Sequence, residues 1–423
     1  MLRSALLAAL IASSAGVRAA PCAFDREFAL GGLARTGIPG AIVFGSDLVR
    51  DDAGRYLVAA YGREPPSSLS FVAVGRYGAD GQLDTTYGTA GFARWFSGDE
   101  FAPVAANRLA VDALGRVYVL LTEFSVPRRN LLLRFAASGE LDTSFGSDGV
   151  ARPVCPGVAT DEDFPHLLLD ALGRPLVSSR AGGVSFVVRL REDGALDPVF
   201  SGDGCAQFPS LDSPQLGLLP RPPGYELVGQ DAQGVWTLRV DATGTPDPGY
   251  GNAGVARASA PFPARDAALQ GSRVVLIGDL GSAVVGFARL TESGALDATF
   301  GDAGVRLVDF TTKDDPNPNQ QARRIVSATD GTLAAIGTYA GFSGIGRTYV
   351  AVVAADGGDL PECDAPNSYV LATEEDGGST AGGVLFDGDR LLVTGSISPF
   401  SSLFGDLAVL ALTPNAAFRA GFE

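Results

Sequence analysis

The chain has one histidine, His166, among its 423 residues, and its four cysteines include no Cys-x-x-Cys pair. Structural zinc sites need four cysteine or histidine ligands in most proteins, so the scarcity of both residue types argues against such a site. A Ser-His-Asp catalytic arrangement would have to use His166, which follows Phe164-Pro165 in a segment that indicates a loop entering a strand. Neither a Gly-x-Ser-x-Gly elbow nor a phosphate-binding glycine loop is present, so the motifs lend catalysis little support.

Long hydrophobic runs are also missing: after the N-terminal segment, the chain contains no stretch of 18 apolar residues. We therefore expect no transmembrane helix in the mature chain. The N-terminal segment itself combines Arg3, the apolar stretch LLAALIA and the small-residue site Val17-Arg18-Ala19. This pattern predicts a secretory signal peptide over residues 1–19, with the mature chain beginning at Ala20.

Positive charge is in short supply, since 32 Lys and Arg residues face 48 Asp and Glu residues and give a net charge of −16. Loss of Arg3 and Arg18 with the signal peptide removes two positive charges and makes the net charge −18. Such an acidic chain is expected to bind neither nucleic acid nor an anionic membrane surface. The charge favours solubility, and affinity for cations or cationic partners is the alternative. We expect a monomer.

Glycine and proline are abundant, with 55 and 26 residues, while hydrophobic residues make up 46% of the chain. This composition is too apolar for a disordered chain and too rich in turn formers for a helical one. One passage recurs five times, in copies that begin 50 to 58 residues apart. The copies are RYGADGQLDTTYGTAGFAR from Arg76, RFAASGELDTSFGSDGVAR from Arg134, RLREDGALDPVFSGDGCAQ from Arg189, RVDATGTPDPGYGNAGVAR from Arg239 and RLTESGALDATFGDAGVRL from Arg289.

Each copy places an Asp eight residues after its Arg, and then an aromatic residue three and a Gly seven residues after the Asp. The pairs are Arg76 and Asp84, Arg134 and Asp142, Arg189 and Asp197, Arg239 and Asp247, and Arg289 and Asp297. Because the Arg fork matches a carboxylate and Asp caps tight turns, we predict that each pair joins a strand end to the following turn. A ring of ligand sites is the alternative, but repetition in every clear unit favours a structural role. The aromatic residue is expected to pack between units, and the Gly to meet a backbone constraint.

Weaker copies extend the array at both ends, at Asp25, at VVAADGGDL from Val352 and at ALTPNAAF from Ala411. With them the chain has seven units, and each unit holds four strand-forming segments joined by Asp-Gly or Ala-Leu-Gly-Arg turns. The sequence therefore predicts an all-β, seven-bladed β-propeller of four-stranded blades, as one domain over residues 20–423. The last unit ends without its tail strand, so we expect the N-terminal strand at residues 31–37 to pair with it and close the ring.

The repeated passage, R-x-x-x-x-G-x-L-D-x-x-F-G-x-x-G-V, resembles the delta-60 repeat of bacterial exported proteins. Its clear and weak copies cover most of residues 25–360. The resemblance implies a propeller-like array, but it implies no activity and no catalytic residue. The final AFRAGFE is similar to a short tail of some Gram-negative exported proteins, so secretion, the periplasm or the cell surface of such a bacterium is expected.

Strands that alternate in direction would place the repeated tails on one face of the propeller and the longer, variable loops on the other. Binding residues are more often found on variable loops that a rigid scaffold carries. We therefore predict a non-enzymatic binding or scaffold module that contacts a protein or saccharide partner through the variable loops. The candidate binding residues are Asp99, Glu100, Asp161, Asp163, Asp314, Asp315, Phe342 and Phe400.

Two alternatives to that prediction stay open. The first is a Ca²⁺ site on the acidic loops, since hard cations take oxygen ligands, although solvated loop carboxylates are favoured and no EF-hand spacing is present. The competing function is a carbohydrate-active hydrolase or lyase with carboxylates in the central funnel. Carboxylates that converge in a pocket around a strongly perturbed acid would favour the enzyme, and a funnel of apolar or scattered polar groups would favour binding.

The four cysteines permit two disulfides in an exported chain. Cys22 and Cys363 belong to tail segments of neighbouring units, so a bridge between them is expected to tie the N-terminus to the ring. Cys205 occupies an apolar slot of the repeat, and Cys155 lies at the far end of the corresponding strand one unit earlier. This placement predicts a Cα separation near or above the limit of roughly 7 Å, so a disulfide and two unpaired thiols both stay open.

Overall fold

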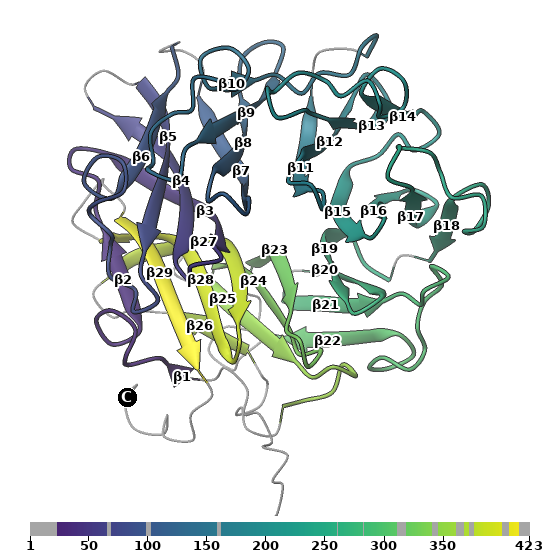
Figure 1. The fold of residues 1–423 in the computed structure, drawn as a ribbon. Coiled ribbons are helices and arrows are strands. Elements are labelled where there is room, and N and C mark those ends of the chain that lie inside the picture. Colours follow the sequence, from purple (N-terminus) through teal and green to yellow (C-terminus); the bar gives the residue numbers. More distant parts are fainter. Residues whose placement is uncertain are drawn as a thin grey trace, which may run out of the picture.

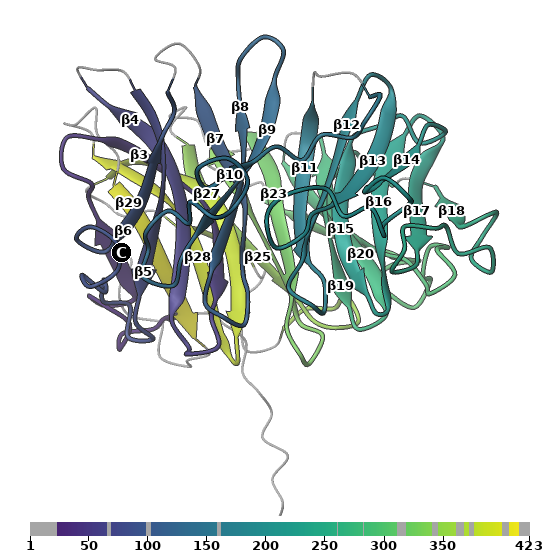
Figure 2. The same ribbon diagram turned by 45° about the horizontal axis from the view of Figure 1, so that its top comes forward.

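The computed structural model describes residues 23–65, 69–98, 103–158, 162–259, 261–281, 283–310, 319–340, 346–360, 368–371, 376–399 and 406–413. Within these ranges the chain is all-β, and seven antiparallel sheets form the predicted seven-bladed β-propeller (Figures 1 and 2). The same ranges contain no helix that is long and apolar enough to cross a membrane.

The first and second strands of each blade form its inner half. Blades I to VII are numbered in chain order from β3, and the first strands lie beside one another around the axis (Figure 1). The first strands are β3 (Ile42–Arg50), β7 (Val104–Val111), β11 (Asp163–Leu169), β15 (Gln215–Arg221), β19 (Ala264–Gln270), β23 (Asn319–Ser327) and β27 (Asp376–Asp387). The second strands are β4 (Tyr56–Glu64), β8 (Val117–Glu123), β12 (Pro175–Ala181), β16 (Gly224–Asp231), β20 (Arg273–Leu280), β24 (Leu333–Ala340) and β28 (Arg390–Pro399).

The third and fourth strands form the outer half of each blade. The third strands are β5 (Leu69–Tyr77), β9 (Arg129–Phe135), β13 (Val184–Arg189), β17 (Gly234–Val240), β21 (Val284–Arg289), β25 (Gly346–Val353) and β29 (Asp406–Thr413). Blades I to VI take their fourth strands from β6 (Phe92–Phe96), β10 (Val150–Ala151), β14 (Cys205–Phe208), β18 (Val255–Ala258), β22 (Val305–Asp309) and β26 (Ser368–Leu371).

The N-terminal segment completes blade VII, as the sequence predicted. Strand β2 (Leu33–Thr36) pairs with β29 in an antiparallel register from Leu33 opposite Leu410 to Thr36 opposite Leu407. The short β1 (Ala23–Phe24) pairs with the same strand nearer its end. Because closure gives β29 a partner along its length, it removes an edge that could otherwise recruit another chain.

The hydrophobic core is divided among the junctions between blades. Seven clusters of buried side chains correspond to the seven pairs of neighbouring blades. The aromatic residue of the repeat lies in five of them, as Phe28, Tyr87, Phe145, Phe200 and Phe300. The predicted packing role of this aromatic residue is therefore confirmed, and each blade depends on its neighbours for burial.

The repeated Arg connects three groups at each regular junction. Arg289 donates to Asp297 at 2.8 Å, lies 4.8 Å from the centre of the Phe300 ring, and donates to the carbonyl of Ala355 in the next tail at 2.7 Å. The same contacts join Arg76 to Asp84, Tyr87 and Ala137, Arg134 to Asp142, Phe145 and Glu192, and Arg189 to Asp197, Phe200 and Ala242. The predicted Arg–Asp pairing is thus confirmed in four copies, and the Arg also ties one blade to the next.

Blade IV departs from the predicted pairing. Arg239 contacts Glu226 at 3.4 Å, instead of Asp247, while it still covers the Tyr250 ring and donates to the Glu292 carbonyl of blade V. Glu226 lies directly opposite Arg239 across the strand pair, where the other four copies have Leu57, Tyr118, Leu176 and Val275. In blade IV, Glu226 on the adjacent strand therefore replaces the repeat Asp as the ion-pair partner of Arg239.

Blade VII replaces its missing repeat Arg with another one. Ala411 occupies the repeat position, and Arg390 at the start of β28 contacts Asp25 and the Phe28 ring of the N-terminal tail instead. Arg390 also donates to the Ala79 carbonyl of blade I at 2.9 Å. The junction that closes the ring thus keeps the same three contacts from a different sequence position.

The junction between blades VII and I also needs glycine. A Cβ atom on Gly382 would lie 2.4 Å from the carbonyl oxygen of Gly45, and one on Gly383 would lie 2.7 Å from the Cα atom of Asp47. The two backbones approach so closely that only glycine fits. This contact holds β3 in place at the level of Asp47.

The two faces of the ring differ as the strand directions require. The repeated tails and the turns between first and second strands share one face, called the tail face below, because every blade is an antiparallel meander. The remaining connections share the opposite, variable-loop face, which is uppermost in Figure 2. The first strand of each blade therefore runs from the variable-loop face to the tail face.

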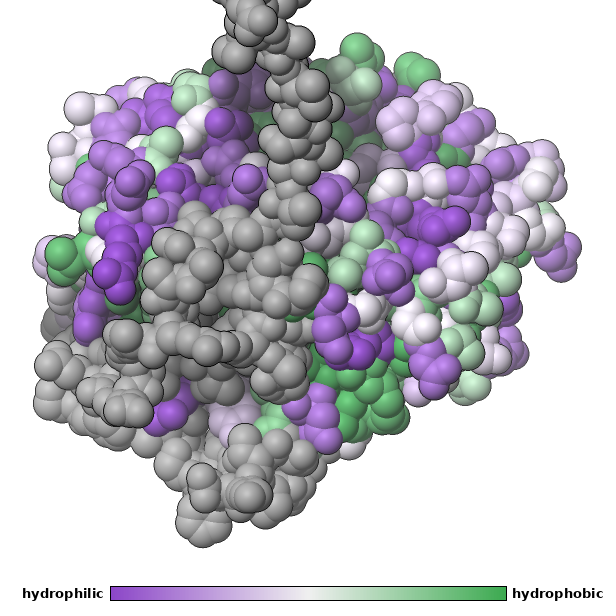
Figure 3. Space-filling model, turned by 90° about the horizontal axis from the view of Figure 1, so that it is seen from below, coloured by the Kyte–Doolittle hydropathy of each residue, from purple (hydrophilic) through white to green (hydrophobic). Residues whose placement is uncertain are grey.

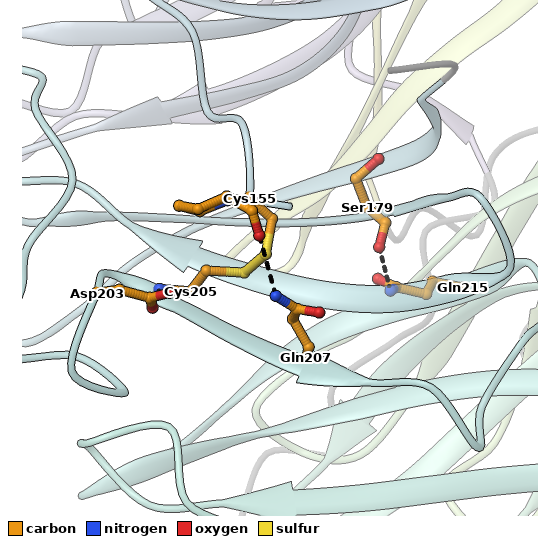
Figure 4. Close-up of a disulfide and its surroundings, with 7 residues drawn as sticks. Cys155, Ser179, Asp203, Cys205, Gln207 and Gln215 are labelled. Atoms are coloured by element: carbon orange, nitrogen blue, oxygen red, sulfur yellow. Dashed lines mark hydrogen bonds between the residues drawn. A yellow bond between two sulfur atoms is a disulfide. The ribbon is translucent and has the colours of Figure 1, made fainter. Parts of the chain in front are cut away.

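Cys155 and Cys205 form a disulfide between blades II and III, with their Cα atoms 5.4 Å apart (Figure 4). The expected separation near or above the limit was wrong, because β10 ends at Ala151 and the chain turns toward blade III before it reaches Cys155. Cys22 and Cys363, the other predicted pair, lie outside the described residues.

Candidate functional site

A β-bulge interrupts the first strand of every blade about halfway between the two faces. The residue that follows each bulge occupies an equivalent place around the axis, and we call these seven positions the bulge ring. The ring consists of Asp47, Arg108, His166, Gly217, Asp266, Arg324 and Val384. Bulges re-aim side chains and occur often beside functional sites, so this ring is the candidate site.

The scaffold does not require charge at the bulge ring. Blade IV has Gly217 and blade VII has Val384 at the same position, and both blades form complete sheets. Five ionisable side chains from five different blades nevertheless meet around the axis. Because burying charged groups is costly unless they are paired, this gathering of ionisable groups makes the ring a candidate functional site.

Two carboxylates of the ring connect neighbouring blades. The Oδ2 atom of Asp47 accepts the backbone N–H of Leu109 in blade II at 2.8 Å. The Oδ2 atom of Asp266 accepts the N–H of Ile325 in blade VI at 2.9 Å. Each carboxylate therefore accepts a backbone N–H from the neighbouring blade, one residue after that blade's ring residue. This contact gives the two Asp residues a structural role.

Burial raises the pKa of both carboxyl groups. The pKa of Asp47 rises to about 6, since desolvation outweighs the nearby charge of Arg108 and the backbone hydrogen bonds. The pKa of Asp266 rises to about 7 for the same reason, and the negative charge of Asp47 adds to the effect. The tail-face carboxylates of Asp84 and Asp142 have lowered pKa values, so the two groups of Asp differ in the sign of the shift.

The two arginines of the ring, Arg108 and Arg324, share a hydrogen-bond acceptor. Arg108 crosses the axis and donates to the Oδ1 atom of Asp266 at 3.2 Å. Arg324 donates to the carbonyl oxygen of Asn107 at 3.0 Å, and Arg108 donates to the same oxygen at 3.3 Å. The two guanidinium groups therefore lie close together, since they share one acceptor.

Arg324 is half-buried, and no described carboxylate pairs with it. Its Nε–H is buried and has no hydrogen-bond partner among the described residues. A half-buried cation beside a second cation is unfavourable unless an anion balances it. The ring thus contains a positive charge that no described carboxylate pairs with.

A cavity of about 180 Å³ lies at the ring. Arg108, His166, Asp266 and Arg324 line it, and apolar side chains such as Leu219 complete the wall. This volume is below the range of about 300–1,000 Å³ that encloses a drug-sized molecule, so the cavity suits a small ligand or one small part of a larger ligand.

The predicted loop residues are not brought together within the described residues. Asp163 is described, and it forms an ion pair with Arg128, which lies on the same variable-loop face. The other seven, Asp99, Glu100, Asp161, Asp314, Asp315, Phe342 and Phe400, lie outside the described residues. The described residues also contain no group of three or more His, Cys, Asp or Glu side chains that could hold a metal ion.

His166 is the one ring residue that the sequence drew attention to, and it lies within a strand instead of a loop. It lies in β11, directly opposite Ser178 of β12, and is 8% exposed. A signal for the ring was present in the sequence: Asp47, Arg108 and His166 each precede by four residues the Asp that starts the turn to the second strand. This spacing marks three of the seven ring positions, because Asp266 and Arg324 are followed at the same distance by Gln270 and Ala328.

The surface seen from below the view of Figure 1 is mostly hydrophilic, with hydrophobic patches scattered among polar side chains (Figure 3). Single exposed apolar side chains, such as Leu114 and Leu172 in turns of the tail face, are normal for soluble surfaces.

Comparison with known proteins supports the fold and leaves the function open. No protein-family model matches the chain, and no curated protein matches its sequence. Among solved structures, the polysaccharide lyase Uly1 is similar with a TM-score of 0.51 and 11% identity, over 88% of this chain and 90% of that one. A protein of unknown function from Dyadobacter fermentans is similar with a TM-score of 0.42 and 11% identity, over 94% and 98% of the two chains. At these identities the likeness concerns the β-propeller fold alone, and the resemblance to the delta-60 repeat stays a prediction.

Proposed function

We propose that this protein is a non-enzymatic binding propeller and that the bulge ring holds an anionic group of its ligand. The observation that carries the proposal is Arg324, a half-buried cation with no described carboxylate partner, next to Arg108 at a cavity. Guanidinium groups bind carboxylate and phosphate oxygens through charge-assisted hydrogen bonds. The sequence predicted binding through the variable loops, and this proposal adds the bulge ring to that binding site.

Titration calorimetry at low ionic strength tests this proposal with sodium acetate and inorganic phosphate as probes. The mature chain should bind at least one of the two, and Arg324→Gln should weaken that binding at least about tenfold, as expected for a lost charged contact. Arg180→Gln is the matched control, because Arg180 pairs with Asp212 on the surface of blade III. Failure of both anions to bind, or equal binding by Arg324→Gln, would refute the proposal.

A second candidate, a carbohydrate-active hydrolase or lyase, has one observation in its favour. Asp47 and Asp266 converge on the axis with raised pKa values, which is the arrangement expected of an acid and base pair. Both oxygens of Asp266 are already engaged, however, by Arg108 and by the Ile325 N–H. We therefore place the enzyme second.

The enzyme candidate is tested by incubation with a panel of neutral and acidic polysaccharides. Hydrolysis would release reducing ends, and elimination would produce an unsaturated sugar that absorbs ultraviolet light. Activity that disappears in Asp47→Asn or Asp266→Asn would place the enzyme first. Activity that survives both substitutions would point to a contaminant or another site.

We also propose export, on the strength of residues 1–19 and of the disulfide between Cys155 and Cys205. Disulfides persist in oxidising compartments and are rare in the cytosol. Mass spectrometry of the protein recovered from a Gram-negative host should find an N-terminus at Ala20. An uncleaved chain retained in the cytoplasm would contradict this proposal.

A further inference from the structure

Blades IV to VII share a glycine at one level of the second strand. Each of these glycines pairs with the residue that precedes the bulge of the first strand, so the four positions are equivalent. They are Gly229, Gly278, Gly337 and Gly395. A glycine within a strand often marks a place where another group approaches the backbone closely, and these four glycines leave room for such a group.

In blades IV to VI an aromatic ring fills this room. A Cβ atom on the glycine would lie 2.2 Å from the ring of Trp236 in blade IV, 2.7 Å from that of Phe262 in blade V and 2.6 Å from that of Tyr349 in blade VI. All three rings are buried and belong to the core between their blade and the preceding one. The glycine and the ring over it are therefore a paired feature of these blades.

Blade VII has the glycine without the ring. The nearest neighbours of a Cβ atom on Gly395 would be backbone atoms of Thr380 and Ala381. Ala408 of β29 lies directly opposite Gly395, at the position that Trp236 holds in blade IV. Directly opposite residues share one side of a sheet, so Ala408 stands where the indole ring would begin.

A cavity of about 310 Å³ lies at this place, between blades VI and VII. Gly395 and Ala408 line it, and Phe24, Leu33 and Ile397 contribute apolar wall. Its volume lies within the range of about 300–1,000 Å³ that is typical of small-molecule sites, and such sites combine an apolar lining with a few polar groups.

The cavity also contains the hydrogen-bond acceptor that the indole uses in blade IV. There the Nε1–H of Trp236 donates to the Oγ atom of Ser213 at 2.7 Å. Ser213 lies two residues before the residue that precedes the bulge, and Ser379 has the same place in blade VII and lines the cavity. The Oγ atom of Ser379 accepts the N–H of Thr348 at 2.8 Å, and a hydroxyl oxygen has a second lone pair for another donor.

We propose that this cavity binds a small ligand with an indole-like group, a flat aromatic ring whose N–H donates to Ser379. The ring would lie over Gly395, as Trp236 lies over Gly229, and would contact Phe24 at the wall. This site is separate from the bulge ring, so it does not depend on the proposed anion site.

Titration calorimetry of the mature chain with indole and indene tests this proposal, because indene has the same shape with a CH₂ group in place of the N–H. Indole should bind at least about threefold more tightly than indene, as expected for one neutral hydrogen bond. Ser379→Ala should remove this difference and leave indene binding unchanged. Ser213→Ala is the matched control, because Ser213 has the equivalent place in blade IV but already binds Trp236, and it should leave the binding of both probes unchanged.

Ala408→Trp places an indole ring where blade IV has its own, so it should abolish the binding of both probes without lowering the melting temperature. Ala408→Leu fills less of the cavity, and it should weaken binding if the tryptophan variant does not fold.

Three results would overturn the proposal. The first is a wild-type chain that does not bind indole. The second is indole binding that neither Ala408 variant changes, since the ligand would then lie elsewhere. The third is equal binding of indole and indene, or an equal loss of indole binding in Ser379→Ala and Ser213→Ala, which would exclude the hydrogen bond to Ser379.

Discussion

Arginine and aspartate occur in this molecule in two sets that have the same chemistry and different surroundings. On the tail face, each repeat Arg contacts a carboxylate, an aromatic ring and the carbonyl of the next blade, and the set recurs around the propeller. In the bulge ring, Arg108, Arg324, Asp47 and Asp266 occur once each, and one Arg has no described carboxylate partner. The difference teaches that repetition marks scaffold, and that ionisable residues which break the repeat mark the site.

The largest loss of stability is expected when the Arg of a tail-face ion pair is removed. Arg289→Ala removes one partner of an ion pair whose side chains are only 6% and 5% exposed, and leaves Arg273, at 3.4 Å, as the remaining cation beside the carboxylate of Asp297. Removal of one member of a buried pair costs about 3–5 kcal/mol. Urea unfolding should show this loss. Arg191→Ala, whose pair with Asp193 is exposed, should leave the free energy of unfolding nearly unchanged, and similar costs in the two variants would contradict the comparison.

Asp266 of the bulge ring and Asp297 of the tail face should change the free energy of unfolding with pH in opposite directions. The pKa of Asp266 is raised, so the folded chain binds more protons than the unfolded chain, and the free energy of unfolding falls as pH rises from about 4 to about 7. Burial also acts to raise the pKa of Asp297, but hydrogen bonds from Thr299 and Arg289 outweigh it and lower the pKa, so its contribution is present above about pH 4 and is lost on further acidification.

Urea unfolding between pH 3 and pH 8 measures these slopes. Asp266→Asn should remove about 4 kcal/mol of the decrease between pH 4 and pH 8, because the pKa of Asp266 rises from 3.8 to about 7 on folding. Asp297→Asn should instead flatten the loss below pH 4. Identical pH profiles for the wild type and Asp266→Asn would show that the ring carboxylate is not buried as described.

The same contrast explains what could be predicted from the sequence. The blade number and most of the Arg–Asp pairing were predictable, because each is recorded several times in the repeat. The ring closure was predictable because the last unit lacks its tail strand and the N-terminus supplies one. The exception at Arg239 depends on Glu226, a residue outside the repeated passage. The disulfide partner of Cys155 was misjudged because the length of β10 is not recorded in the spacing.

The bulge ring could not be predicted in the same way. Asp47 and Arg324 are far apart in sequence, and only closure of the propeller brings their strands around one axis. The bulges that turn these side chains to equivalent places leave no composition signal, since the residues before them are ordinary ones such as Ala106 and Ala264. The pKa shifts depend on burial, which no single blade provides.

The smallest effect is expected when a ring arginine is replaced. Arg108→Gln removes the charge that faces Asp266, but at pH 5 the raised pKa of Asp266, about 7, keeps this carboxyl group protonated. No buried charge is then left unpaired, so the free energy of unfolding should change by less than about 1 kcal/mol. Arg289→Gln is the matched variant, and it should cost more at pH 5 because the lowered pKa of Asp297 keeps that carboxylate ionised. At pH 8 the cost of Arg108→Gln should rise as Asp266 loses its proton without a cation beside it. Equal costs of the two variants at pH 5 would mean that the ring arginine, like the repeated ones, belongs to the scaffold.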